Sequence, residues 1–194
     1  MKKKWRHVVM LAKTMLKQSL PLLILCGLGG IIAGNTLGLM RDLFVSIPGL
    51  IVVIPGIIAL RGNISTAFGS RIGSAYHLGV IHEEDFWNDA LLQNVIGSIL
   101  LSIFVSAIIG ILAYLTTFFL FHLSPDPLEL ISIVLIAGIT SGLILTALTI
   151  GIIYIVFKRG YDPDNITGPA LATVGDIITM LCIFGSALLV EAFL

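Results

Sequence analysis

The chain has 194 residues, of which 57% are hydrophobic and only 11% charged, and its formal net charge is 0. Soluble domains carry about 25% charged residues, so this chain lacks the polar surface that a globule in water needs. Its long continuous apolar runs do not fit a membrane β-barrel, whose strands alternate apolar and polar residues. We therefore predict an all-α integral membrane protein that crosses the cell membrane several times and has no nucleic-acid partner.

The first 18 residues form a basic segment ahead of the first apolar run. We predict that residues 1–18 are an amphipathic interfacial segment that contacts membrane lipids, with its basic side chains on the anionic inner leaflet. The alternative is a plain orientation signal. Residues 19–194 are predicted to form one transmembrane domain. The basic residues of the segment are Lys2, Lys3, Lys4, Arg6, Lys13 and Lys17.

Five apolar segments predict five transmembrane helices, because about 20 helical residues cross the hydrocarbon layer. The predicted spans are 19–40, 43–61 with an extension to about 80, 88–121, 128–157 and 166–193. Lys158 and Arg159 add positive charge after the fourth span. The positive-inside rule then predicts a cytoplasmic N-terminus, a C-terminus outside, and cytoplasmic loops at 76–87 and 158–165.

The second segment carries helix-breaking residues. Pro48 and Pro55 lack a backbone donor, and "RGN" at 61–63 places a glycine and an amide after the second proline. We predict a broken helix here, and interpret Arg61 and Arg71 as the place where it emerges on the cytoplasmic side. A proline-kinked helix without function is the alternative.

Small and polar residues recur at four-residue spacing on three of the spans. Each such stripe is typical of a helix-packing seam, whereas three in one small bundle favour a polar interior. The stripes are Gly30, Gly34 and Gly38; Asn94, Ser98, Ser102, Ser106 and Gly110; and Gly138, Gly142, Thr146 and Thr149. The 77–89 loop carries a cluster of ionisable residues that could bind a cation and sense its level. The alternative is a solvated loop in which the acids cap a helix. The cluster consists of His77, His82, Glu83, Glu84 and Asp85.

The stretch "YDPDNITGPALATVGDIIT" (161–179) carries three aspartates at and within the last span. Asp162, Asp164 and Asn165 fit a helix start, where Asp164 or Asn165 caps the free N–H groups. Asp176 lies roughly 16 Å deeper, near the middle of the hydrocarbon layer. An aspartate there costs about 2.5–3.5 kcal/mol on insertion scales. We interpret Asp176 as part of a watery cation pathway; a buried, hydrogen-bonded acid is the alternative.

The face of the last span around Asp176 offers only oxygen ligands. Ala172, Thr173 and Thr179 share it at three- and four-residue spacing. Carboxylate and hydroxyl oxygens suit hard cations, foremost Mg²⁺, which a single carboxylate would hold through its water shell. A two-fold homodimer with this helix near its axis would supply two carboxylates to one pore.

Two blocks resemble the MgtE family of divalent-cation transporters, and most closely its solute-carrier branch found in animals. They are "PGIIALRGNISTAFGSRIGSA" (55–75) and "DPDNITGPALATVGDIIT" (162–179). The resemblance implies a homodimeric, Mg²⁺-selective, channel-like pore with Asp176 as the central ligand. It also implies a backbone carbonyl ligand at Ala172 and an acidic residue at the cytoplasmic mouth, Asp162. The candidate metal-binding residues are Asp176, Ala172, Thr173, Asp162, Asn63, Gly62 and Asp164.

The family's bacterial members carry cytoplasmic Mg²⁺-sensing domains, which this chain is expected to lack, so a separate cytoplasmic regulatory subunit is left open. We predict transport of divalent cations, foremost Mg²⁺, with no organic cofactor. The alternatives are a proton- or sodium-coupled carrier in which Asp176 titrates, and a non-transporting membrane subunit that docks an accessory protein. An enzyme is not expected, because no Ser-His pairing or His-Glu-x-x-His pattern occurs.

Overall fold

The computed structural model describes the backbone of residues 2–82, 85–159 and 163–193. Most side chains of the first 22 residues, the side chain of Phe157 and all side chains of 163–170 lie outside that description. These ranges contain helices and no strand, which confirms the all-α prediction. The helices are α1 (Lys2–Leu39), α2 (Arg41–Ser46), α3 (Leu50–His77), α4 (Asp89–Leu120), α5 (Pro127–Lys158) and α6 (Pro163–Phe193).

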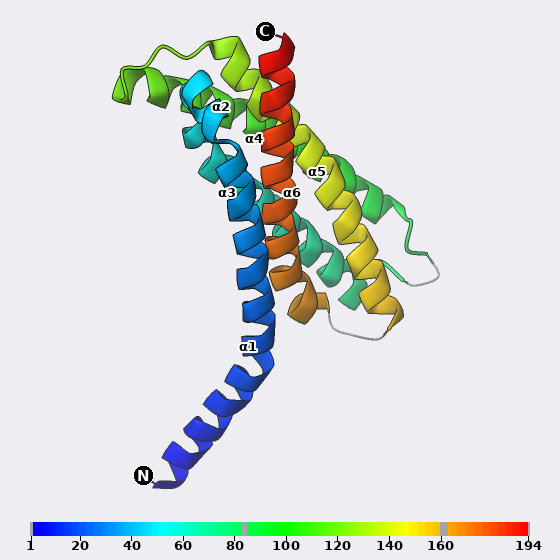
Figure 1. Cartoon of the computed structure of the whole chain (residues 1–194). Helices are drawn as coiled ribbons and strands as arrows, with labels where there is room; N and C mark the ends of the chain where they lie inside the picture. The colour runs from blue at the N-terminus through cyan, green and yellow to red at the C-terminus, as the bar shows by residue number, and fades with distance from the viewer. Residues whose placement is uncertain (1, 83–84, 160–162, 194) are drawn as a thin grey trace.

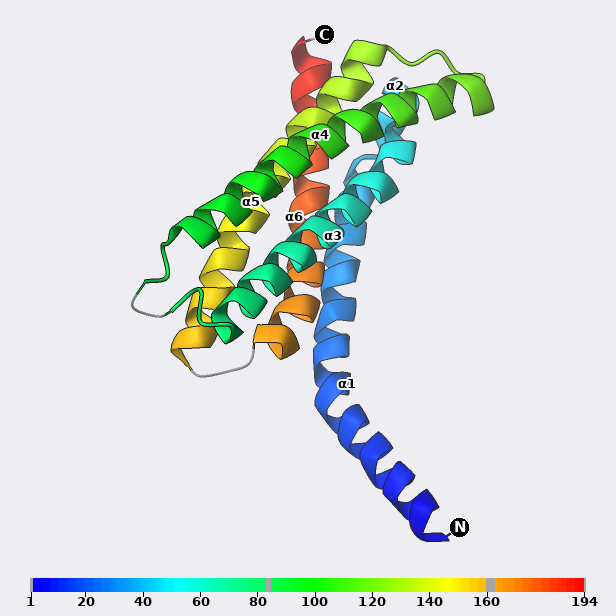
Figure 2. The same cartoon turned by 180° about the vertical axis from the view of Figure 1, so that it is seen from behind.

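The long helices alternate in direction, and the two ends of the chain lie at opposite ends of the molecule (Figure 1). Helices α3, α4, α5 and α6 pack on one another, and α1 packs against α6 on the outside of this bundle. Helix α4 crosses the bundle obliquely (Figure 2). The first turns of α1 diverge from the bundle and have no other helix beside them in either view.

Four of the described helices are long and apolar enough to cross a membrane: α3, α4, α5 and the part of α6 from Leu171 onward. The chain is therefore a multi-pass membrane protein. Among the described side chains of α1, the apolar part is Leu23–Leu39, which does not test a full crossing by this helix. A fifth span and the sidedness of the N-terminus stay predictions. Helix α1 itself runs without interruption through the expected boundary at residue 18.

The second predicted segment is interrupted at one proline but not at the other. The chain turns between α2 and α3, next to Pro48, and Gly49, the residue immediately before α3, has a φ of 92°. Glycine fits this left-handed conformation, and a β-carbon there would also meet the Thr117 hydroxyl of α4.

The prediction of a break at Pro55 and "RGN" was wrong, because α3 continues through both. Pro55 removes a single backbone hydrogen bond on an exposed side of the second turn. The opposite side of that turn is fully buried, with Val53 and Ile57 at 0% exposure. Burial of these side chains holds the helix together where one hydrogen bond is missing.

Two buried clusters hold the bundle together. The larger includes Leu50 and Ile57 of α3, Leu130 and Ile133 of α5, and Ile183 of α6. The smaller cluster lies at the other end of α3 and includes residues of the loop between α3 and α4. That loop is anchored by Ile81 and Phe86, which pack with residues that include Phe68, Ile72, Leu91 and Ile153.

Candidate functional site

Asp176 lies in an open groove where α1, α3 and α6 meet. The groove has a volume of about 250 Å³, and Asp176 is the one ionisable residue among the described residues of its wall. The rest of the wall is apolar or small: Gly30, Ala33, Gly34 and Leu37 of α1, Ile54 and Ile58 of α3, and Met180 of α6. Glycines on α1 leave room beside the carboxylate, since β-carbons at Gly30 and Gly34 would meet no atom within 4 Å.

The Asp176 side chain is half-buried, and no donor among the described residues lies within hydrogen-bond distance of its carboxylate. The described side chains therefore do not supply the dry, hydroxyl-bonded seam that was the alternative interpretation. Buried charges are normally paired or bound to a cation. The groove leaves one side of this carboxylate accessible to a ligand.

The neighbours of Asp176 on α6 have different environments. Ala172, one turn earlier, is exposed. Thr173 is half-buried and faces α1, so that a β-carbon on Gly29 would meet its methyl group. Gly29 is thus the residue that lets α1 approach α6, whereas Gly30, Gly34 and Gly38 of the predicted stripe face open space.

The two candidate residues on α3 lie beyond the groove. Gly62 continues the ridge of Ile54 and Ile58 at four-residue spacing, and its carbonyl accepts a hydrogen bond from the Thr66 hydroxyl. Asn63 is exposed. Neither is among the residues that line the groove with Asp176.

The acidic start of the last span is only partly described. Helix α6 begins at Pro163, so Asp164 and Asn165 lie inside its first turn, and the predicted cap falls on side chains outside the described residues. Proline at the first helical position loses no hydrogen bond, which explains the earlier start. Asp162 lies outside the described residues, and so does the side chain of Asp164.

The interior of the bundle contains a positively charged side chain, Arg61, whose position the sequence analysis predicted wrongly. Arg61 was expected to emerge on the cytoplasmic side, but it is only 2% exposed. Its Nη1 donates a hydrogen bond to the Ser102 hydroxyl of α4 at 2.8 Å. The signal was present in the sequence: Arg61 stands four residues after Ile57 and seven before Phe68, on the face that both bury.

The stripes on the third and fourth spans form a packing seam. Ser98, Ser102 and Ser106 of α4 are at most 2% exposed. β-Carbons on Gly138 and Gly142 of α5 would meet Ser106 and Ser102, respectively, so α4 and α5 approach each other closely along this line.

A family of known proteins matches the sequence of most of this bundle. The model of the MgtE family, described as divalent cation transporter, matches residues 54–186, which is more than half of the chain. The chain belongs to the MgtE family. This match runs from Ile54 in the wall of the groove through Asp176 and nearly to the end of α6.

Similar proteins belong to solute carrier family 41, as the resemblance predicted. Member 2 from Mus musculus is 28% identical over 81% of this chain, and member 2 from Homo sapiens is 27% identical over the same share. Member 3 from Rattus norvegicus is 29% identical, also over 81% of this chain. The chain spans only 28% of the mouse protein and 35% of the rat protein, so it matches about a third of each relative.

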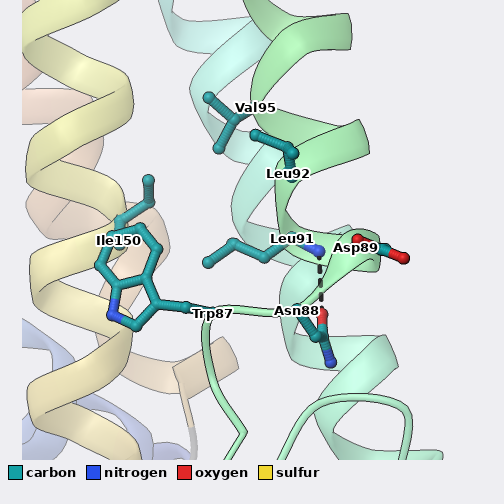
Figure 3. Close-up of a pocket in the computed structure, with 7 residues that line it drawn as sticks. All are labelled: Trp87, Asn88, Asp89, Leu91, Leu92, Val95 and Ile150. Carbon is teal, nitrogen blue, oxygen red and sulfur yellow. Dashed lines mark hydrogen bonds between the residues drawn. The ribbon is translucent and has the colours of Figure 1, made fainter.

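The loop before α4 offers this MgtE-family chain no metal cluster among its described residues. No group of three or more His, Cys, Asp or Glu side chains comes together in the described ranges, and Glu83 and Glu84 lie outside them. A second hollow of about 230 Å³ lies at the start of α4. In Figure 3, Trp87 lies over this hollow near Ile150 of α5, while the Asp89 carboxylate points away. The hollow is an apolar pocket.

Proposed function

We propose that this chain carries divalent cations across the membrane, with Mg²⁺ as the preferred ion, along a pathway shared by two copies. The observation that carries the proposal is the Asp176 carboxylate, which lies unpartnered among the described residues in an open groove. Membership in a family of divalent cation transporters points to the same class of substrate.

The size of the groove is compatible with a hydrated ion. Mg²⁺ binds six oxygens in an octahedron and gives up its water reluctantly. Six waters at about 30 Å³ each occupy roughly 180 Å³, which is less than the groove's volume of about 250 Å³. A carboxylate amid apolar walls would then attract the ion through its water shell, without stripping it.

Two copies would complete the pathway. The described part of one chain supplies a single carboxylate to the groove, and the groove is open on one side. A two-fold axis beside α6 would bring a second Asp176 to the same ion. The uncovered glycines of α1 in the wall of the groove leave room for this approach, because β-carbons at Gly30 and Gly34 would meet nothing within the chain.

Other residues would extend the pathway from Asp176. Ala172 is exposed one turn before it, where a backbone carbonyl could join the ion's water shell, and Thr173 lies beside it. Asn63 presents an amide from α3, next to Gly62. Asp162 and Asp164 would draw cations to the cytoplasmic mouth.

Removing the carboxylate tests the proposal directly. We expect Asp176→Asn in proteoliposomes to lower Mg²⁺ uptake at least tenfold, because the isosteric amide keeps the packing and loses the charge. Glu191→Gln is the matched control: Glu191 is an exposed acid near the end of the same helix and should leave uptake unchanged. Full uptake by Asp176→Asn would reject the assigned ligand. Uptake that requires a proton or sodium gradient would instead identify a coupled carrier.

Cross-linking tests the shared pathway. With Cys26 and Cys182 replaced by alanine, a cysteine introduced at Ala172 should form a cross-linked dimer in membranes. A cysteine introduced at Leu101, an exposed residue of α4, is the control and should stay monomeric. Equal cross-linking at both positions would argue against a two-fold axis beside α6.

A further inference from the structure

Arg61 is a charged residue enclosed by three helices. It lies in α3 roughly 16 Å along the helix axis from Leu50. Its guanidinium contacts Ser102 of α4, and a β-carbon on Gly142 of α5 would meet its Nη1 atom. At 2% exposure the side chain reaches neither water nor lipid. Arginine stays ionised in proteins, so the charge cannot be relieved by losing a proton.

One edge of this guanidinium has no partner. Nη1 bonds to Ser102, whereas Nε and Nη2 are buried and have no acceptor among the described residues. These two nitrogens lie on the same side of the planar group and point their N–H bonds in parallel. This is the edge with which arginine holds carboxylates and phosphates through two bonds.

The described surroundings add donors and no carboxylate, and the titratable group that interacts electrostatically with Arg61 is the Cys182 thiol of α6. Ser98 and Ser106, one turn to either side of Ser102, are 0% exposed, and their hydroxyl oxygens also have no partner. Within the described ranges no carboxylate forms an ion pair with Arg61. An unpaired charge in a low-dielectric interior is strongly destabilising. The bundle would therefore be stabilised by an acceptor that carries negative charge.

We propose that the Nε–Nη2 edge of Arg61 binds a small monovalent anion, such as chloride or nitrate, between α3, α4 and α5. The ligand must be small, because the site is enclosed and the approach of Gly142 and Ser102 leaves no room on the Nη1 side. A neutral water would satisfy the hydrogen bonds but not the charge. The site is separate from the Asp176 groove, whose wall does not include Arg61.

Thermal stability of the purified full chain in nanodiscs measures this binding without transport. The protein is compared in sodium chloride, sodium nitrate and sodium gluconate at equal ionic strength, without divalent cations. Gluconate is too large for an enclosed site. We expect Tm to be about 3 °C higher in chloride and nitrate than in gluconate, and the rise to saturate with anion concentration.

Variants assign the effect to Arg61. Arg61→Gln should remove the difference between the salts. Arg71→Gln, which changes an exposed arginine on the same helix, should keep it. Equal Tm of the wild type in all three salts would overturn the proposal and point to buried water instead. A difference that persists in Arg61→Gln would overturn it as well.

A second measurement covers the case in which Arg61→Gln does not fold. Crystals of the wild type grown in bromide should show an anomalous peak within hydrogen-bonding distance of Arg61 Nε. A bromide peak there supports the site, and a map without one beside Arg61 rejects it. Because neither readout uses Mg²⁺ or Asp176, failure here leaves the transport proposal untouched.

Discussion

Gly142 of α5 lies directly against Arg61 of α3. A β-carbon on Gly142 would meet Nη1 of the guanidinium and would come within 2.9 Å of the Ser102 hydroxyl oxygen of α4. Three helices therefore converge at this position, and the lack of a side chain on one of them lets the arginine reach the serine on another. The polar interior of the bundle depends on this glycine.

Gly142→Ala should lower the thermal stability of the protein. The added methyl group must displace the guanidinium and lengthen its 2.8 Å hydrogen bond to Ser102, which we expect to destabilise the fold by about 1–3 kcal/mol. Gly151→Ala on the same helix is the control, because a β-carbon there meets nothing within 4 Å and alanine favours a helix. Equal melting temperatures for the two variants would contradict the packing described.

A second close approach joins α1 to α6. A β-carbon on Gly29 would meet the methyl group of Thr173, so Gly29→Ala should weaken this contact and lower Tm by a few degrees. Thr173→Ser removes the methyl and keeps the hydroxyl, and the double variant should regain most of the loss. Gly27→Ala is the control, because a β-carbon at Gly27 would meet nothing within 4 Å, and its Tm should equal that of the wild type. No rescue by Thr173→Ser would mean that α1 packs elsewhere.

Filling the Asp176 groove tests whether ions use it. Gly34 lines the groove and Gly38, one turn later, does not, and both face open space. Gly34→Leu should reduce Mg²⁺ uptake into proteoliposomes several-fold with little change in Tm, because the leucine occupies the room beside the carboxylate. Gly38→Leu should transport normally. Normal uptake by Gly34→Leu would place the ion path outside this groove.

The start of α4 depends on one amide. Asn88 accepts a hydrogen bond from the Leu91 N–H at 3.1 Å (Figure 3) and donates one to the Val80 carbonyl at 2.8 Å. Asn88→Ala loses both and should destabilise the protein by about 0.5–2 kcal/mol. Asn88→Asp keeps the hydrogen bond from the Leu91 N–H and loses the one to the Val80 carbonyl. Its Tm should therefore lie between those of the wild type and Asn88→Ala. Thermal unfolding in detergent orders the three proteins, and an Asp variant no better than alanine would exclude the cap as the main contribution.

The sequence by itself determined the class of the protein and the limits of two of its long helices, α4 and α5. Apolar runs of about 30 residues have one stable form in a bilayer, since a helix satisfies its backbone groups internally. The prediction of 88–121 and 128–157 therefore falls within a residue of α4 and α5 at each end. The blocks around Pro55 and Asp176 likewise pointed to the family that the comparison confirms.

Which side of a helix is covered was decided only by tertiary structure. Sequence spacing puts Gly30 and Gly34 on one stripe, but neighbouring Gly29 is the residue that meets α6. The sequence analysis placed Arg61 where the helix emerges from the membrane, because an arginine is normally hydrated. In the structure, Ser102 of α4 and Gly142 of α5 lie against it. Burial of a charge depends on side chains brought together from distant parts of the chain. The spacing of Arg61 from Ile57 and Phe68 indicates a shared helix face, but it does not say which helices cover that face.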